Sequence, residues 1–204
     1  MAHSATIAAL AGLFLLVLAD TVRTRRTLAL SPGGTHPRVT PTGTETAPTR
    51  TGGTDKNAWI RSRYASLVSA LPGFGVPLAR VSAVAKALLA HWALETGTGR
   101  AEWGWNFGNI RAFARTTAPW HRLSDGLPYL DFQSLDAGVR AYLGLASRAQ
   151  YAPAWRALVA GSTALEWMRS ICSLGARSWH PWHEPGSTND YLGRLRAVET
   201  VLGT

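Results

Sequence analysis

The strongest constraint on the fold is a stripe of apolar residues that recur at helical spacing: Val81, Val84, Ala85, Leu88 and Trp92. This spacing places them on one face of a helix, and such a face is buried against a protein core. Pro77 suits the start of a helix, and Gly97 and Gly99 are typical helix terminators. The sequence therefore predicts a long buried helix that ends just before Gly97.

Glu95 continues the same stripe, so the predicted helix carries its carboxylate toward the protein interior. The negative end of the helix dipole and a partly apolar wall both disfavour the charged form of the group. Such a carboxyl group can hold a proton near neutral pH and give it to a leaving group, as the acid of a glycosidase does. Spacing alone is also compatible with a solvated glutamate at a helix end.

The N-terminus holds an uninterrupted run of small and apolar residues, 7–19. Its length lies between that of a signal-peptide core and that of a membrane span. Three arginines follow the run within residues 23–26 and none precedes it, which by the positive-inside rule places the downstream side on the cytoplasmic face. We expect residues 1–26 to form an uncleaved membrane anchor, with a cleaved signal segment as the alternative.

Residues 27–56 are rich in Thr, Pro and Gly and contain almost no large apolar side chains. Such a segment buries too little surface to offset its ordering entropy, which is typical of a flexible tether. Hydrophobic residues make up 46% of the chain, enough for a packed core. We expect residues 57–204 to form that core as one folded domain.

Most of residues 57–204 is predicted to be helical, because apolar residues recur at helical spacing between recognisable caps. The stretch from about Trp103 to Phe132 is different, since glycines, prolines and a Ser-Asp-Gly turn separate short apolar runs. The predicted fold is therefore α+β, mostly helical, with a small β-hairpin lobe and Glu95 at the floor of a cleft. The expected N-caps are Asp55 or Asn57, Ser134, Thr163 (in a capping box with Glu166) and Asn189.

The charge balance is basic, with 21 Lys and Arg against 12 Asp and Glu, a net charge of +9. This suggests an anionic partner: nucleic acid, acidic lipid or a cell-wall polymer. Nine tryptophans fit a polymer of sugars or of bases. Because the basic residues are spread along the chain without a concentrated basic helix face, we expect no nucleic-acid partner. Cys172 is the only cysteine, which excludes an intramolecular disulfide and favours core packing.

Two segments that follow the predicted helix form an ordered pair of motifs. Residues 93–99 read Ala-Leu-Glu-Thr-Gly-Thr-Gly, and residues 106–112 read Asn-Phe-Gly-Asn-Ile-Arg-Ala. Further matches come at residues 129–134, 151–152, 175–176 and 190–195. In this order the chain resembles, over residues 58–203, the N-acetylglucosaminidase peptidoglycan hydrolases that include the flagellar wall-piercing enzyme. The resemblance implies a lysozyme-like fold, cleavage of the peptidoglycan glycan strand, and no metal; no cofactor is expected.

By its position in the first motif, Glu95 matches the family's catalytic glutamate. The resemblance therefore implies that Glu95 is the general acid that protonates the glycosidic oxygen. Tyr191 matches a tyrosine that lines the catalytic cleft near the acid. Asn106 and Phe107, with the adjacent Trp105, would contact the substrate beside it, although Phe107 could equally pack the turn. All four are expected to bind substrate.

The loop at residues 178–188 adds Trp179 and Trp182, which are expected to stack on sugars, with surface packing as the alternative. His180, His183 and Glu184, with His121, invite a zinc interpretation. Their spacing matches no strong ligand pattern, so we expect no metal there.

One departure from the family pattern concerns the second carboxylate. Family members often carry one after a Thr-Thr pair, but here residues 116–117 are followed by Ala118. Asp131, on the returning strand, is the candidate replacement, and a structural role is its alternative. Without a second carboxylate, three chemistries stay open: water positioned by weaker groups, assistance by the substrate's N-acetyl group, or a lytic transglycosylase with a single glutamate. A muramidase and a non-catalytic wall-binding module are further alternatives.

The biological setting follows from the predicted layout. A wall-cutting domain on a membrane-anchored tether fits a phage virion protein that opens the wall during entry. It fits equally a bacterial enzyme of the periplasm or cell envelope that remodels the wall or serves a secretion apparatus.

Overall fold

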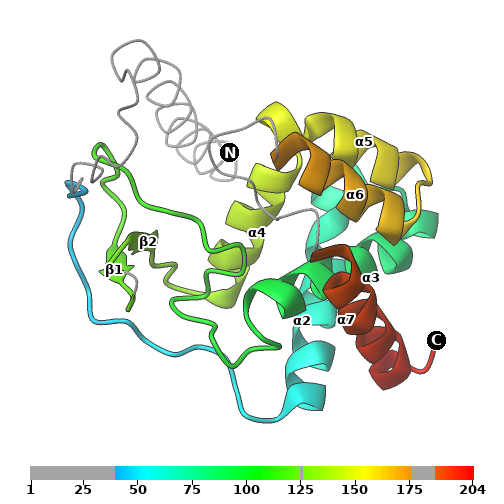
Figure 1. Cartoon of the computed structure of the whole chain (residues 1–204), viewed down its shortest axis with the longest axis horizontal. Helices are drawn as coiled ribbons and strands as arrows, with labels where there is room; N and C mark the ends of the chain where they lie inside the picture. The colour runs from blue at the N-terminus through cyan, green and yellow to red at the C-terminus, as the bar shows by residue number, and fades with distance from the viewer. Residues whose placement is uncertain (1–39, 125, 176–186) are drawn as a thin grey trace, which may run out of the picture. The chain divides into compact units, whose positions relative to one another are not determined.

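A computed structural model of the chain describes residues 40–124, 126–175 and 187–204 (Figure 1). The fold is mostly helical with one two-stranded antiparallel sheet, as the sequence predicts. In chain order the elements are α2 (Lys56–Ala70), η1 (Leu71–Phe74), α3 (Leu78–Glu95), β1 (Trp120–Arg122), β2 (Pro128–Leu130), α4 (Leu135–Ala146), η2 (Ala149–Tyr151), α5 (Ala152–Ala160), α6 (Ala164–Gly175) and α7 (Ser187–Leu202).

The predicted N-terminal anchor, residues 1–26, lies outside the described residues. Within the part of the chain that is described, no helix is both long and apolar enough to cross a membrane. The membrane anchor therefore stays a prediction.

Contacts group the described residues into two units. The helical unit comprises residues 49–110 and 132–204, and the hairpin unit comprises residues 111–131 together with residues 40–48. The predicted domain of residues 57–204 stays a prediction; in this grouping its residues 111–131 belong with residues 40–48.

Helix α3 is the centre of the helical unit and contacts α2, α5, α6 and α7 (Figure 1). The predicted stripe is confirmed, because Val84, Ala85, Leu88 and Trp92 are fully buried. Surrounding helices complete the core with Leu143, Met168 and Ile171 among others, and Cys172 is buried there as expected. An 18-residue helix with this much apolar surface needs cover on several sides, which explains why helices pack all around it.

Most predicted helix ends are confirmed by their hydrogen bonds. The carboxylate of Asp55 accepts from the backbone N–H groups of Asn57 and Ala58, and Ser134 Oγ accepts from Ala137 N. The capping box forms as predicted: Thr163 N donates to Glu166 Oε2 (2.8 Å), and Glu166 N donates to Thr163 Oγ1 (3.2 Å).

The predicted cap of the last helix is wrong. Helix α7 begins at Ser187, so Asn189 lies within its first turn instead of preceding it. Ser187 and Thr188 are also residues that commonly begin helices, and the sequence alone did not rank them above Asn189.

The hairpin unit pairs Trp120 with Leu130, His121 with Tyr129, and Arg122 with Pro128. Residues 40–48 run beside it: Gly43 N donates to Thr116 O, and Thr46 N donates to Trp120 O, both at 2.7 Å.

The flexible tether predicted over residues 27–56 stays a prediction, and its described part, residues 40–55, makes specific contacts. This segment is held by hydrogen bonds to strand β1 and to neighbouring loops, so it does not need a large apolar surface to become ordered. A composition argument counts apolar side chains and misses this backbone contribution.

Candidate active site

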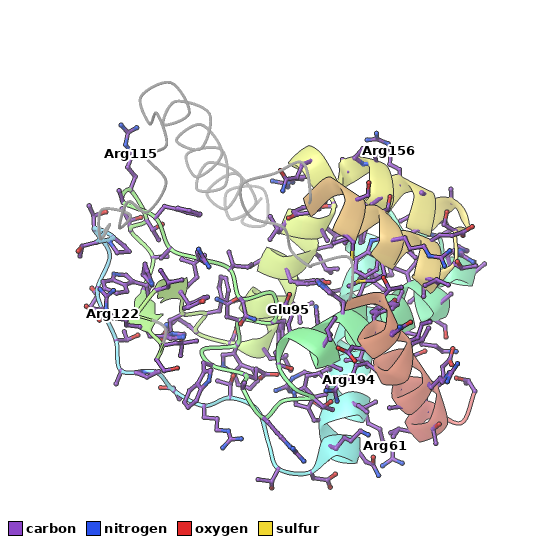
Figure 2. The ribbon with its side chains drawn as sticks, viewed as in Figure 1. Arg61, Glu95, Arg115, Arg122, Arg156 and Arg194 are labelled. Carbon is purple, nitrogen blue, oxygen red and sulfur yellow. The ribbon has the colours of Figure 1, made fainter. Side chains whose placement is uncertain are left out.

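Glu95 is the last residue of α3, and its side chain is 11% exposed. The prediction that the stripe carries this carboxylate inward is confirmed (Figure 2). The helix ends here because Thr96 acts as the C-cap: its Oγ1 donates to Trp92 O (2.7 Å) and accepts from Gly99 N (3.1 Å). Gly97 follows with φ +58°, a conformation that glycine adopts readily.

Asn109 holds one oxygen of this carboxylate. Its Nδ2 donates to Glu95 Oε2 at 2.6 Å and lies 3.4 Å from the Glu95 backbone oxygen. Asn109 has φ +47°, which asparagine tolerates better than most residues. Although the sequence analysis included Asn109 only as part of a motif, the structure makes it a direct partner of Glu95.

Asn106 stabilises the loop that presents Asn109. Its amide nitrogen donates to Ile110 O (2.9 Å), and Ile110 N donates to Asn106 Oδ1 (2.8 Å). The side chain is buried and its amide is used within the loop. These polar atoms serve a turn, and the contact of Asn106 with substrate stays a prediction.

His91 faces the other carboxylate oxygen. It lies one turn before Glu95 on α3, is fully buried, and places Nε2 3.7 Å from Glu95 Oε1. Its Nδ1 shares a 2.5 Å hydrogen bond with the hydroxyl of Tyr142 on α4. The edge of Trp167 on α6 packs against the ring, with centroids 5.3 Å apart. The sequence analysis missed His91, although four-residue spacing on a helix was a usable signal.

The tyrosines near this carboxylate remain protonated well above neutral pH. Burial raises the pKa of Tyr142 well above its usual value, and the negative charge of Glu95 raises it further. Burial also raises the pKa of Tyr151, again with a contribution from Glu95. Both side chains are therefore neutral phenols near neutral pH.

Two of the predicted substrate contacts are residues of the core. Tyr191 is fully buried, and its hydroxyl donates to Ala87 O at 3.1 Å. Phe107 is also fully buried and stacks on Trp92, with ring centroids 4.2 Å apart and planes 12° from parallel. Both residues give aromatic cover to α3, which is apolar on several faces, and their contact with substrate stays a prediction.

A second carboxylate lies in the loop after α3. Glu102 is fully buried and accepts hydrogen bonds from Arg63 Nη2 (2.7 Å), Trp59 Nε1 (2.7 Å) and Thr51 Oγ1 (2.9 Å). This ion pair joins the loop to α2 and to the segment before α2. The sequence analysis missed it, because no local pattern links residues so far apart in the chain.

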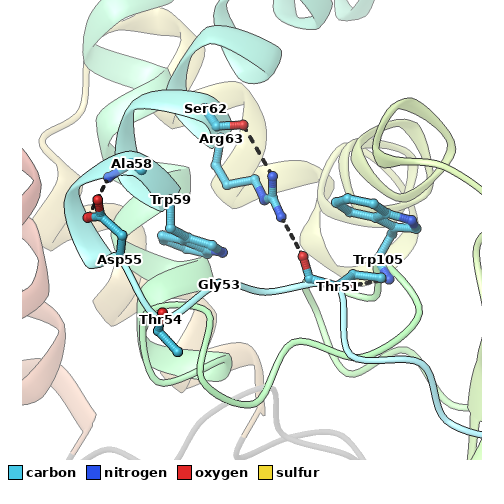
Figure 3. A pocket seen from close by; sticks show the side chains of 9 residues that line it. All are labelled: Thr51, Gly53, Thr54, Asp55, Ala58, Trp59, Ser62, Arg63 and Trp105. Atoms are coloured by element: carbon cyan, nitrogen blue, oxygen red, sulfur yellow. Dashed lines mark hydrogen bonds between the residues drawn. The ribbon is translucent and has the colours of Figure 1, made fainter.

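A hollow of about 410 Å³ lies beside this ion pair (Figure 3). Trp105 is only partly buried there, and the Arg63 guanidinium lies 4.9 Å from its ring centroid, within cation–π range. The prediction that Trp105 contacts substrate stays open to test. The lining residues are Thr51, Gly53, Thr54, Asp55, Ala58, Trp59, Ser62, Arg63 and Trp105.

Asp131 belongs to the hairpin unit. Its Oδ2 accepts a hydrogen bond from Thr46 Oγ1 at 2.7 Å, which joins residues 40–48 to the returning strand. Burial lowers the pKa of the nearby His121, and the negative charge of Asp131 acts in the opposite direction. These contacts give Asp131 a structural role, while its contact with substrate stays a prediction.

The remaining predicted site residues cannot be placed, because Trp179, Trp182 and the His180–Glu184 segment lie outside the described residues. Among the residues that are described, no group of three or more His, Cys, Asp or Glu side chains could hold a metal ion.

Comparisons of the chain with family models, curated proteins and solved structures find no match. The geometry around Glu95 is therefore the main basis for a function.

Proposed function

We propose that this chain cleaves the glycan strand of peptidoglycan, with Glu95 as the general acid. The observation that carries the proposal is a largely shielded carboxylate, 11% exposed, held at a helix end by the side chain of Asn109. Both residues belong to the motifs that resemble those of the N-acetylglucosaminidases. A lysozyme-like relationship is part of this proposal.

The contacts of Glu95 suit a group that releases a proton during the reaction. As the proton moves to the glycosidic oxygen, negative charge develops on the carboxylate and positive charge on the sugar. Asn109 Nδ2 already points at Oε2 at 2.6 Å, so it stabilises that developing charge without reorganisation.

Several other carboxylates of the helical unit are engaged elsewhere. Asp55 caps α2, Glu102 binds Arg63, Asp136 pairs with Arg140, and Glu166 caps α6. This favours chemistry that needs one glutamate. The substrate's own N-acetyl group would then assist in an endo-β-N-acetylglucosaminidase, and a lytic transglycosylase is the second candidate.

Trp105 and its hollow suit a sugar ring. Aromatic faces stack on the apolar face of a sugar, and the hydroxyl groups of Ser62 and Thr54 on the same lining can bond to its polar edge. The net charge of +9 favours approach to an anionic wall. We keep the membrane anchor and the virion or cell-envelope location as parts of the proposal.

The test is mass spectrometry of fragments released from purified peptidoglycan by the full chain. A reducing-end N-acetylglucosamine supports the glucosaminidase, a reducing-end N-acetylmuramic acid a muramidase, and an anhydro end the transglycosylase. Glu95→Gln should abolish release, whereas the control Glu45→Gln, at a half-exposed carboxylate of the hairpin unit, should not. Binding to peptidoglycan without any released fragment would instead support a wall-binding module.

A further inference from the structure

The geometry points to His91 as a positioning residue that couples the protonation of Glu95 to a buried hydrogen bond with Tyr142. This inference rests on the proposed role of Glu95 and goes beyond it. A fully buried imidazole joins the two groups: Nε2 lies 3.7 Å from Glu95 Oε1, and Nδ1 lies 2.5 Å from the Tyr142 hydroxyl. The three side chains come from two helices, α3 and α4.

The ring can support either protonation state of Glu95 by changing tautomer. When Glu95 is ionised, Tyr142 donates to Nδ1, and the ring proton on Nε2 faces the carboxylate. When Glu95 is protonated, its O–H donates to Nε2, and the ring proton on Nδ1 is donated to the tyrosine oxygen. The second state holds one more proton than the first, and that proton is on Glu95.

Tyr142 anchors the ring in both states and keeps its own proton. Burial and the charge of Glu95 both raise its pKa, so a tyrosinate next to the carboxylate is disfavoured. Among the described residues, the electrostatic neighbours of Tyr142 besides Glu95 are Tyr151 on η2 and Tyr191 on α7, which burial also keeps neutral.

Trp167 on α6 restricts the imidazole further. Its ring meets His91 edge-on, with an angle of 82° between the planes. Because the His91 ring packs against Trp167 and is hydrogen-bonded to Tyr142, it has little freedom to rotate away from Glu95. His91 therefore aims Nε2 at the carboxylate throughout the reaction.

The first test is the pH profile of fragment release for full-length wild type, His91→Phe and Tyr142→Phe. In His91→Phe the new ring keeps the packing against Trp167, but the variant lacks the Nε2–H donor that favours the ionised carboxylate of Glu95. We expect the alkaline limb, which reports loss of the Glu95 proton, to move to higher pH by about one unit, and the maximal rate to fall about tenfold to a hundredfold. Tyr142→Phe should shift the limb in the same direction by less.

His121→Phe is the matched control, since it replaces another buried histidine, in the hairpin unit, and should leave the limb in place. His91→Gln, which can still present an amide donor, should restore part of the shift. If His91→Phe and Tyr142→Phe both retain the wild-type limb, the positioning role is overturned.

The second test does not depend on activity. The ring nitrogen resonances of His91 report its tautomer, and they should titrate together with Glu95 in wild type and change in Glu95→Gln. Identical His91 titrations in the two proteins would overturn the inference even if the wall is cleaved. Conversely, a wild-type chain that releases no fragments but shows this coupling would refute the proposed function and leave the coupling standing.

Discussion

Glu95 is the last residue of α3 and Glu102 lies in the loop after it, yet their surroundings differ. Glu102 is fully buried against the cation of Arg63 and accepts further hydrogen bonds from Trp59 and Thr51. Glu95 is partly exposed, and the partners described above are the neutral amide of Asn109 and the imidazole of His91.

The comparison separates two uses of a buried carboxylate. A matched cation and several donors surround Glu102, so its contribution is to hold the loop, α2 and the preceding segment together. Glu95 keeps some access to solvent, and the partners named for it carry no fixed positive charge, which suits a role in the reaction. We therefore expect substitutions at Glu95 to affect reaction rate and substitutions around Glu102 to affect stability.

The largest effect is expected for Glu95→Gln. Removing the acid should lower the rate of glycan cleavage by about a hundredfold to ten-thousandfold. The unfolding free energy should change by less than about 1 kcal/mol, because glutamine retains an oxygen for Asn109. Fragment release and chemical denaturation measure the two quantities, and a large loss of stability with little loss of rate would reverse the comparison.

Arg63→Met should destabilise the chain by about 3–5 kcal/mol, because it leaves Glu102 as a buried charge without its cation. Arg61→Met, at an exposed arginine on the same helix, is the matched control and should change the unfolding free energy little. Chemical denaturation measures the unfolding free energy of both variants. An equal loss in Arg63→Met and Arg61→Met would contradict the structural role of Glu102.

Gly99→Ala tests the turn that connects the two carboxylates. Gly99 has φ +85°, and an added Cβ would lie 2.5 Å from Trp59 Cδ1. Strain and overpacking should together cost about 2–4 kcal/mol. At Gly73 an added Cβ meets nothing within 4 Å, so Gly73→Ala is the control. In thermal unfolding, Gly99→Ala should unfold at a lower temperature than Gly73→Ala.

The smallest effect concerns alkaline pH. Unfolded tyrosines lose their protons near pH 10, while burial keeps Tyr142 and Tyr191 protonated in the folded chain. Stability should therefore fall as pH rises above about 10, by up to about 1.4 kcal/mol per pH unit for each such tyrosine. Tyr142→Phe should reduce this slope in denaturation experiments, whereas the control Tyr64→Phe on α2 should not.

The residues that the sequence predicted correctly depend on near neighbours in the chain. The stripe through Trp92, the caps at Asp55 and Ser134, and the inward position of Glu95 all follow from side-chain spacing within a few helical turns. The hairpin follows from turn residues between short apolar runs in the same way. Asn189 was misplaced because Ser187 and Thr188 before it can also begin a helix.

The roles of other residues depended on which elements meet. Tyr191 and Phe107 match motifs, but only the packing of α7 and of the loop against α3 shows that both are buried. The order of residues 40–55 also depends on partners far along the chain.

By itself, the sequence determined where most helices begin and end, which face of α3 is buried, and that a carboxylate lies at its end. Tertiary structure alone decided that Asn109 contacts Glu95, that Tyr142 bonds to His91, and that Arg63 pairs with Glu102. The reason is physical. Helical periodicity and capping act over a few residues, whereas a hydrogen bond or ion pair between distant segments exists only once the fold brings them together.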